Sequence, residues 1–300
     1  MSLAERAETS VEDADDGPAF ERRGGQPPAS ALIYASPHSG RVYPEQMMTR
    51  SRLDRRAVRQ SEDALVDQLI APAEQLGASL FLARYGRAYV DVNREPDELD
   101  GAMFEGGADG ARTPRVAAGL GVVPRVVARG RDIYAARLPA GEGERRIGQV
   151  WRPYHEGLDA LTREARARFG GTVLIDWHSM PSAAARSERA RTGTAPDVVL
   201  GDRFGQSCAP SLTAWLQHAL EACGYTVVRN TPYAGGWTTE RYGRPEQQAD
   251  CLQVELNRAL YLDEATLTPN RRFPTLQRDL MRVTERLLAR TAAQARPMLT

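Results

Sequence analysis

The stretch Thr172-Val-Leu-Ile-Asp176-Trp177-His178-Ser179 decides how the rest of the chain is interpreted. Its apolar run, residues 173–175, follows two glycines and is typical of a buried strand in a mostly parallel sheet. Asp176, His178 and Ser179 follow where this strand ends. Ligands and catalytic groups collect at the carboxyl ends of strands in open α/β sheets, so we expect His178 to lie in a functional site.

A second strand ends in the same way. Residues 31–36 form another apolar run, and His38 follows it in Ser36-Pro37-His38-Ser39-Gly40. Two of the four histidines of the chain therefore occupy strand ends. Strands and helices alternate along the sequence, and no linker separates two cores. We predict an α/β fold of one domain, with a mixed, mostly parallel sheet flanked by helices.

Hydrophobic periodicity and turn residues place the other elements. We expect helices over about 52–76, 150–169, 210–223 and 274–293, and strands over about 78–83, 87–92, 225–229 and 251–256. Residues 97–148 and 183–194 lack clear periodicity and are expected to be loops. Residues 1–29 are acidic and poor in apolar residues, so we expect a disordered tail that precedes a catalytic domain over 30–300.

The composition excludes several classes of function. With 39 basic and 39 acidic residues, the chain gives no electrostatic reason to expect nucleic-acid or membrane partners. Every basic residue is an arginine, which excludes Schiff-base lysine chemistry and a P-loop. Cys208, Cys223 and Cys251 lack the spacing of a thiolate zinc site or a disulfide framework, which indicates a reducing cytoplasm. No run approaches the length of a membrane span, and the acidic N-terminus is unlike a signal peptide.

The two strand-end histidines favour a metal site. A catalytic zinc typically takes three protein ligands from His, Asp and Glu. His38 and His178 would supply two, and Glu62 or Asp63, in the expected helix, would supply the third. Asp176 is a candidate for orienting a histidine. The alternative is that each histidine is a hydrogen-bonded structural residue.

Glu255 lies in an otherwise apolar strand, where a charge is costly unless it is paired or functional. A carboxylate beside a metal site is the natural general base. The alternative is a buried ion pair with Arg258 or Arg94. Arg94 and Arg241 also offer guanidinium groups that could bind a substrate carboxylate with two hydrogen bonds.

A nucleophilic mechanism is the competing interpretation. Ser179 adjoins His178, but adjacent residues of a strand point to opposite faces. No serine lies in a G-x-S-x-G elbow, and Cys208 and Cys251 lack a recognisable catalytic setting. We therefore favour the metal site.

A set of short motifs runs in one order from about residue 30 to 265. They are Ser36-Pro-His38-Ser-Gly40, Glu62-Asp63-Ala-Leu-Val-Asp67, Tyr85-Gly-Arg87-Ala-Tyr-Val-Asp91-Val-Asn93-Arg94, Pro153-Tyr154-His155, Leu174-Ile-Asp176-Trp-His178-Ser179, Pro196-Asp197, Gly235-Gly236, Tyr242-Gly243 and Gln253-Val-Glu255-Leu256. In this ordered set the sequence resembles the N-formylglutamate amidohydrolases. That family is similar in fold and site to the zinc carboxypeptidases and the aspartoacylase group.

The resemblance implies a zinc carboxypeptidase-like fold and a Zn²⁺ ion bound by His38, Asp63 and His178. It also implies Glu255 as the general acid/base, and Asn93 and Arg94 as substrate contacts. Two departures stand out. Zinc-peptidase relatives carry a carboxylate ligand three residues after the first histidine, where this chain has Arg41. Family members carry Thr-Arg-His-Tyr-Gly where this chain has Thr239-Glu240-Arg241-Tyr242-Gly243.

We therefore predict a zinc-dependent amidohydrolase of a small N-acyl amino acid. N-formyl-L-glutamate, which would yield L-glutamate and formate in histidine degradation, is the first candidate. Another N-acyl amino acid or a small peptide is the alternative within this class. A non-catalytic protein that binds carboxylates on the same fold is the alternative from another class. The length of the 97–148 segment permits a lid over the site.

Overall fold

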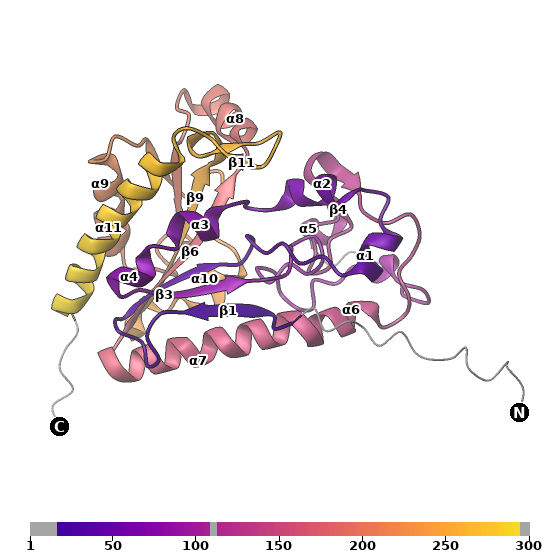
Figure 1. Ribbon diagram of the computed structural model, residues 1–300, viewed down its shortest axis with the longest axis horizontal. Helices are drawn as coiled ribbons and strands as arrows, with labels where there is room; N and C mark the ends of the chain where they lie inside the picture. The colour runs from indigo at the N-terminus through magenta and orange to yellow at the C-terminus, as the bar shows by residue number, and fades with distance from the viewer. Residues whose placement is uncertain (1–16, 109–112, 295–300) are drawn as a thin grey trace, which may run out of the picture.

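A seven-stranded sheet runs through the protein (Figure 1), and the computed structural model describes residues 17–108 and 113–294. The strand order is β1-β3-β2-β6-β9-β7-β8. Within the described sheet, the antiparallel pairs are β1 with β3 and β7 with β9, and all other neighbours run parallel. The strands are β1 (Phe20–Arg23), β2 (Leu32–Ser36), β3 (Ser79–Ala83), β6 (Thr172–Met180), β7 (Val198–Gly201), β8 (Val227–Arg229) and β9 (Ala249–Asn257). The predicted mixed, mostly parallel sheet is confirmed.

The β6 strand lies at the centre of the sheet and is buried along its whole length. Val173 and Ile175 pack into the core on one face, while Leu174 packs into the core on the other. This alternation explains why the apolar run is unbroken, because each face of the strand meets a hydrophobic layer. Parallel pairing with β2 and β9 brings the carboxyl ends of the three strands to one edge.

Helices cover both faces of the sheet. They are α1 (Glu45–Arg50), α2 (Arg55–Val58), α3 (Val66–Ile70), α4 (Ala73–Leu76), α5 (Pro114–Ala117), α6 (Glu142–Arg146), α7 (Arg152–Phe169), α8 (Ser182–Thr192), α9 (Pro210–Glu221), α10 (Trp237–Tyr242) and α11 (Phe273–Gln294). The predicted long helices correspond to α7, α9 and α11. Within the described residues, none of the helices combines the length and the apolar character that a bilayer crossing requires.

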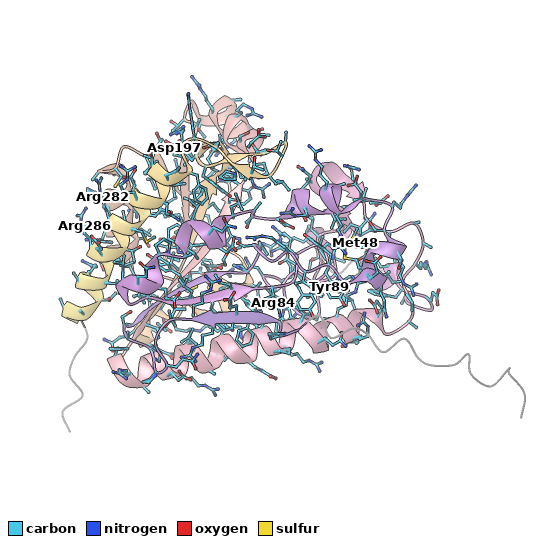
Figure 2. The ribbon with its side chains drawn as sticks, in the orientation of Figure 1. Met48, Arg84, Tyr89, Asp197, Arg282 and Arg286 are labelled. Atoms are coloured by element: carbon cyan, nitrogen blue, oxygen red, sulfur yellow. The ribbon has the colours of Figure 1, made fainter. Side chains whose placement is uncertain are left out.

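The two longest helices lie on opposite sides of the sheet (Figure 1). The α7 helix packs Leu158 and Leu161 into the core that contains Leu174. The α11 helix packs into the other core and turns Arg282 and Arg286 outward (Figure 2). The minor elements are the two-stranded pairs β4 (Val126–Val127) with β5 (Arg131–Asp132), and β10 (Leu262–Asp263) with β11 (Thr268–Pro269), and short turns at 59–61, 101–103, 128–130, 147–151, 245–247 and 258–260.

The single helix predicted over 52–76 is wrong. The chain forms α2, then an extended segment at Glu62, then α3 and α4, and Leu65 has a positive φ of 65°. The amide of Asp63 donates to the carbonyl of His38 at 3.0 Å. This tertiary hydrogen bond holds the segment against the loop that follows β2, which local periodicity does not reveal.

Two further predictions are corrected. Residues 87–92 form turns rather than a strand, and the amide of Asp91 donates to the carbonyl of Val122. The predicted loop over 183–194 contains α8. Only Ala185 and Glu188 of α8 are buried, so this helix has no apolar stripe by which periodicity could reveal it. The short strand β7 was not predicted.

The disordered tail predicted over residues 1–29 is too long, because part of this range is folded. Residues 1–16 lie outside the described residues, but Phe20–Arg23 form β1 and pair with β3. The ring of Phe20 stacks on that of Phe81, with centroids 4.4 Å apart. Residues 113–148 of the expected long loop also pack into the core through Val122, Val123 and Ile133.

The packing of β1 against α7 can be tested at Gly157. A Cβ atom at this helical position would collide with the ring of Phe20. Helix propensity favours alanine over glycine by about 1 kcal/mol, whereas overpacking costs about 1–3 kcal/mol. The ring of Phe81 also lies 3.0 Å from this Cβ and remains there when Phe20 is removed. We therefore expect Gly157→Ala to lower the free energy of unfolding more in the wild-type background than in a Phe20→Ala background. Urea denaturation of the four proteins of this cycle measures both effects. An equal effect in both backgrounds would contradict the packing.

Candidate active site

A cavity of about 540 Å³ opens at the carboxyl ends of β2, β6 and β9. His38, from the loop after β2, and His178, from β6, line it together with Asp63 and Glu255. Three of these residues, His38, Asp63 and His178, are buried and place one ligand atom each within 4.8 Å of the others. The structure therefore brings together the two histidines that the strand ends indicated.

The three side chains are oriented as metal ligands would be. His178 Nδ1 lies 3.0 Å from Asp63 Oδ2, and His38 Nδ1 lies 3.3 Å from the same oxygen. On the far side of each ring, His38 Nε2 contacts Asp91 Oδ1 at 2.7 Å and His178 Nε2 contacts Asp176 Oδ2 at 3.0 Å. Carboxylates that accept the Nε2 protons orient both rings so that their Nδ1 atoms face the same oxygen of Asp63.

This arrangement fits a divalent metal. His38 Nδ1 is a buried nitrogen without a hydrogen-bond partner in the described structure, and such a nitrogen is costly unless something binds it. Two imidazole nitrogens and one carboxylate oxygen are also a donor set that catalytic zinc prefers. His38, Asp63 and His178 could therefore hold zinc, and Asp91 and Asp176 would orient the two rings.

The structure distinguishes the two candidate carboxylates. Glu62 points away from the cavity, where its Oε1 accepts hydrogen bonds from Tyr43 Oη at 2.9 Å and Arg59 Nε at 3.0 Å. Asp63 points between the histidines, and Arg258 Nη2 donates to its second oxygen at 3.0 Å. Burial alone would raise the pKa of Asp63, but the adjacent His178 and His38 hold this pKa well below its usual range. Asp63 is thus ionised and faces the site.

Glu255 faces the cavity from β9. It pairs in register with His178 on β6, and Gln253 Nε2 donates to its Oε1 at 2.9 Å. It forms no ion pair within the described chain, since Arg258 pairs with Asp63 instead. Burial raises the pKa of Glu255 to about 7, and the nearby His178 opposes that rise. An unpaired, buried carboxylate beside the histidines is placed as a proton acceptor.

Asn93 and Arg94 also lie at the cavity. Asn93 Oδ1 accepts from the Thr238 amide at 2.8 Å, which leaves its Nδ2 3.2 Å from His178 Nε2. Two side chains of the α7 region bind the backbone carbonyls of the residues on either side of Asn93. His155 Nε2 contacts the carbonyl of Val92 at 2.8 Å, and Trp151 Nε1 donates to that of Arg94 at 2.9 Å.

His155 therefore has a structural role. Its Nδ1 contacts Tyr242 Oη at 2.9 Å, so both ring nitrogens have partners within the protein. Burial lowers the pKa of His155 to about 4, which keeps the ring neutral. Held in this way, it fixes the segment that carries Asn93 and Arg94.

The structure places Arg241 outside the cavity lining and gives no support to its predicted contact with substrate, which stays a prediction. Its guanidinium pairs with Asp159 of α7 at 2.6 Å on the outer surface. The neighbouring Glu240 pairs with Arg203 at 2.8 Å and also lies outside the cavity lining. The acidic residue that departs from the family pattern therefore does not face the cavity.

Several residues of the cavity were missed by the sequence interpretation. Arg87 Nη2 pairs with Asp91 Oδ2 at 2.6 Å, and Arg258 Nε donates to Ser179 Oγ at 3.1 Å. The four-residue spacing of Arg87 and Asp91 in the sequence is a pattern that indicates an ion pair. Arg115 also lines the cavity, on the wall that residues 115–130 contribute. It comes from a segment without periodicity, so no sequence signal indicated it.

Metal binding should distinguish Asp63 from Glu62. Asp63→Asn removes a ligand charge, so we expect its zinc affinity to fall on the order of a hundredfold or more. Glu62→Gln makes the same chemical change one residue away, outside the cavity, and should retain wild-type affinity. Competition with a chromophoric chelator measures both. Loss of zinc in Glu62→Gln with retention in Asp63→Asn would reverse the assignment.

Comparison with known proteins identifies the family of the chain. Residues 30–262 match the family model described as N-formylglutamate amidohydrolase. The chain is 35% identical to an N-formylglutamate deformylase of Pseudomonas aeruginosa over 64% of this chain and 67% of the relative, and 35% identical to one of Pseudomonas putida over 66% and 70%. A crystal structure of N-formylglutamate amidohydrolase from Ralstonia eutropha superposes with a TM-score of 0.85 at 34% identity, covering 92% of this chain and 99% of the other. The chain belongs to the N-formylglutamate amidohydrolase family.

Proposed function

We propose that this protein is a zinc-dependent amidohydrolase that converts N-formyl-L-glutamate to L-glutamate and formate. The observation that carries the proposal is the buried group His38, Asp63 and His178, which shares one cavity with the unpaired carboxylate of Glu255. The deformylase names of the relatives from two Pseudomonas species support the substrate. The reaction would belong to histidine degradation, and the three free cysteines are in keeping with a reducing cytoplasm.

His38, Asp63 and His178 would hold the ion, and Asp91 and Asp176 would keep the two imidazole rings in the ligating orientation. Zinc at such a site polarises a carbonyl group and lowers the pKa of water. Arg87 and Arg258 also line the cavity, where they pair with Asp91 and Asp63, the carboxylates that contact the two histidines.

Glu255 would move the proton in this reaction. Its carboxylate takes a proton from water as the water oxygen attacks the formyl carbon, and the C–N bond then breaks. The same carboxyl returns the proton to the departing nitrogen of glutamate. Arg94, beside Asn93, would hold a substrate carboxylate and so place the formyl group near His178.

Glu255→Gln separates catalysis from metal binding. The amide has the same shape but cannot accept a proton, so we expect kcat to fall about 100- to 10,000-fold while zinc content is unchanged. Steady-state kinetics with N-formyl-L-glutamate and metal analysis of the same preparation provide the measurement. Glu62→Gln is the control, because it replaces a buried glutamate that lies outside the cavity.

Wild-type turnover by Glu255→Gln would show that another group is the base. Turnover of a different N-acyl amino acid or small peptide, with none of N-formyl-L-glutamate, would change the substrate but retain the mechanism. A zinc-free wild-type protein that binds L-glutamate and hydrolyses nothing would instead be a carboxylate-binding protein.

A further inference from the structure

Two of the four arginines that line the cavity form no direct ion pair with a described residue. Arg87 and Arg258 are neutralised locally, by Asp91 at 2.6 Å and by Asp63 at 3.0 Å. Arg94 donates only to backbone carbonyls, those of Leu120 at 3.1 Å and Asn93 at 2.8 Å. Arg115 is exposed to the cavity and forms no ion pair within the described chain. Arg94 and Arg115 therefore line the cavity without a direct ion pair among the described residues.

The segment around α5 holds these two arginines near each other. The amide of Leu120 donates to the carbonyl of Arg115 at 2.9 Å, and the carbonyl of Leu120 accepts from Arg94 Nε. Burial lowers the pKa of Arg94 and the nearby Asp91 opposes this, while the charges of Arg87 and Arg115 lower it further. Two like charges that share a cavity wall repel each other, so an anion bound between or beside them would stabilise this arrangement.

The surface beside these two arginines is apolar. Leu120, Pro124, Val126 and Val127 line the same part of the cavity, within residues 115–130. A ligand that fits this surface has a short aliphatic portion together with negative charge. Arg94 follows Asn93, which contacts His178, whereas Arg115 comes from a separate segment. The two cations are thus available to two different carboxylates of one small molecule.

We propose that Arg115 is the specificity-determining residue of this site and binds the side-chain carboxylate of an acidic N-acyl amino acid, whose α-carboxylate binds Arg94. The inference rests on the proposed function for the identity of the reaction. It explains how the chain recognises an acidic side chain although Arg241 is directed away from the cavity.

The test compares N-formyl-L-glutamate with N-formyl-L-glutamine, which differ only in the side-chain charge. We expect Arg115→Gln to lower kcat/KM for N-formyl-L-glutamate on the order of tenfold, mostly through KM. Turnover of N-formyl-L-glutamine should change less than about twofold and also shows that the variant is folded. Arg115→Lys should retain most of the preference, and Arg189→Gln, an exposed arginine of α8 outside the cavity, should match wild type. If Arg115→Gln left the ratio of the two kcat/KM values unchanged, because both substrates lost activity equally or neither did, the proposal would be overturned.

A binding measurement separates this inference from the proposed reaction. Glutarate has two carboxylates at the spacing of those in glutamate, and glutaramate replaces one of them by an amide. Calorimetric titration of the zinc-loaded protein should show tighter binding of glutarate than of glutaramate, and Arg115→Gln should abolish this difference. If wild type hydrolyses no N-formyl amino acid but shows this result, the proposed reaction fails and the role of Arg115 stands. If Arg115→Gln retains the difference, the role of Arg115 fails whatever the enzyme hydrolyses.

Discussion

The structure depends on the compensation of buried negative charge. Asp63, Asp91, Asp176 and Glu255 are all buried around two imidazole rings. An isolated buried carboxylate is strongly unfavourable, so each needs a hydrogen-bond donor or a cation from elsewhere in the chain. Asp63 and Asp91 obtain both, from the histidines and from Arg258 and Arg87. Glu255 has only the amide of Gln253, which leaves it the least compensated of the four and the one most suited to exchange a proton.

The sheet determines where this cluster can form. Parallel strands β2, β6 and β9 end at one edge of the sheet. Their pairing therefore places the His38 loop, His178 and Glu255 at that edge. The remaining groups come from irregular segments, which tertiary hydrogen bonds hold in place. Asp63 is fixed by the carbonyl of His38, and Asn93 is flanked by backbone carbonyls that His155 and Trp151 bind. Rigid strands therefore supply one part of the site, and hydrogen-bonded loops supply the other.

This division also explains what the sequence could predict. The strands that carry His38, His178 and Glu255 have apolar runs that end in polar residues, a pattern that is visible locally. The break at Glu62 was missed because an apolar spacing compatible with one helix persists through it, while the hydrogen bond from Asp63 to His38 is tertiary. The pairing of Arg241 was missed because its partner Asp159 lies 82 residues away on α7. Arg115 carries no local signal, since its place at the cavity follows from how the α5 segment folds back onto Arg94.

The use of arginine alone at the cavity has a chemical consequence. The four cations, Arg87, Arg94, Arg115 and Arg258, are guanidinium groups that keep their protons at any physiological pH, and the chain contains no lysine. A neutral side-chain amine beside a reactive acyl carbon could capture the acyl group as a stable amide or condense with a carbonyl. A protonated guanidinium attracts the same anionic molecules without competing for the acyl group. The guanidinium groups of the cavity can thus bind anions while remaining inert toward an acyl group.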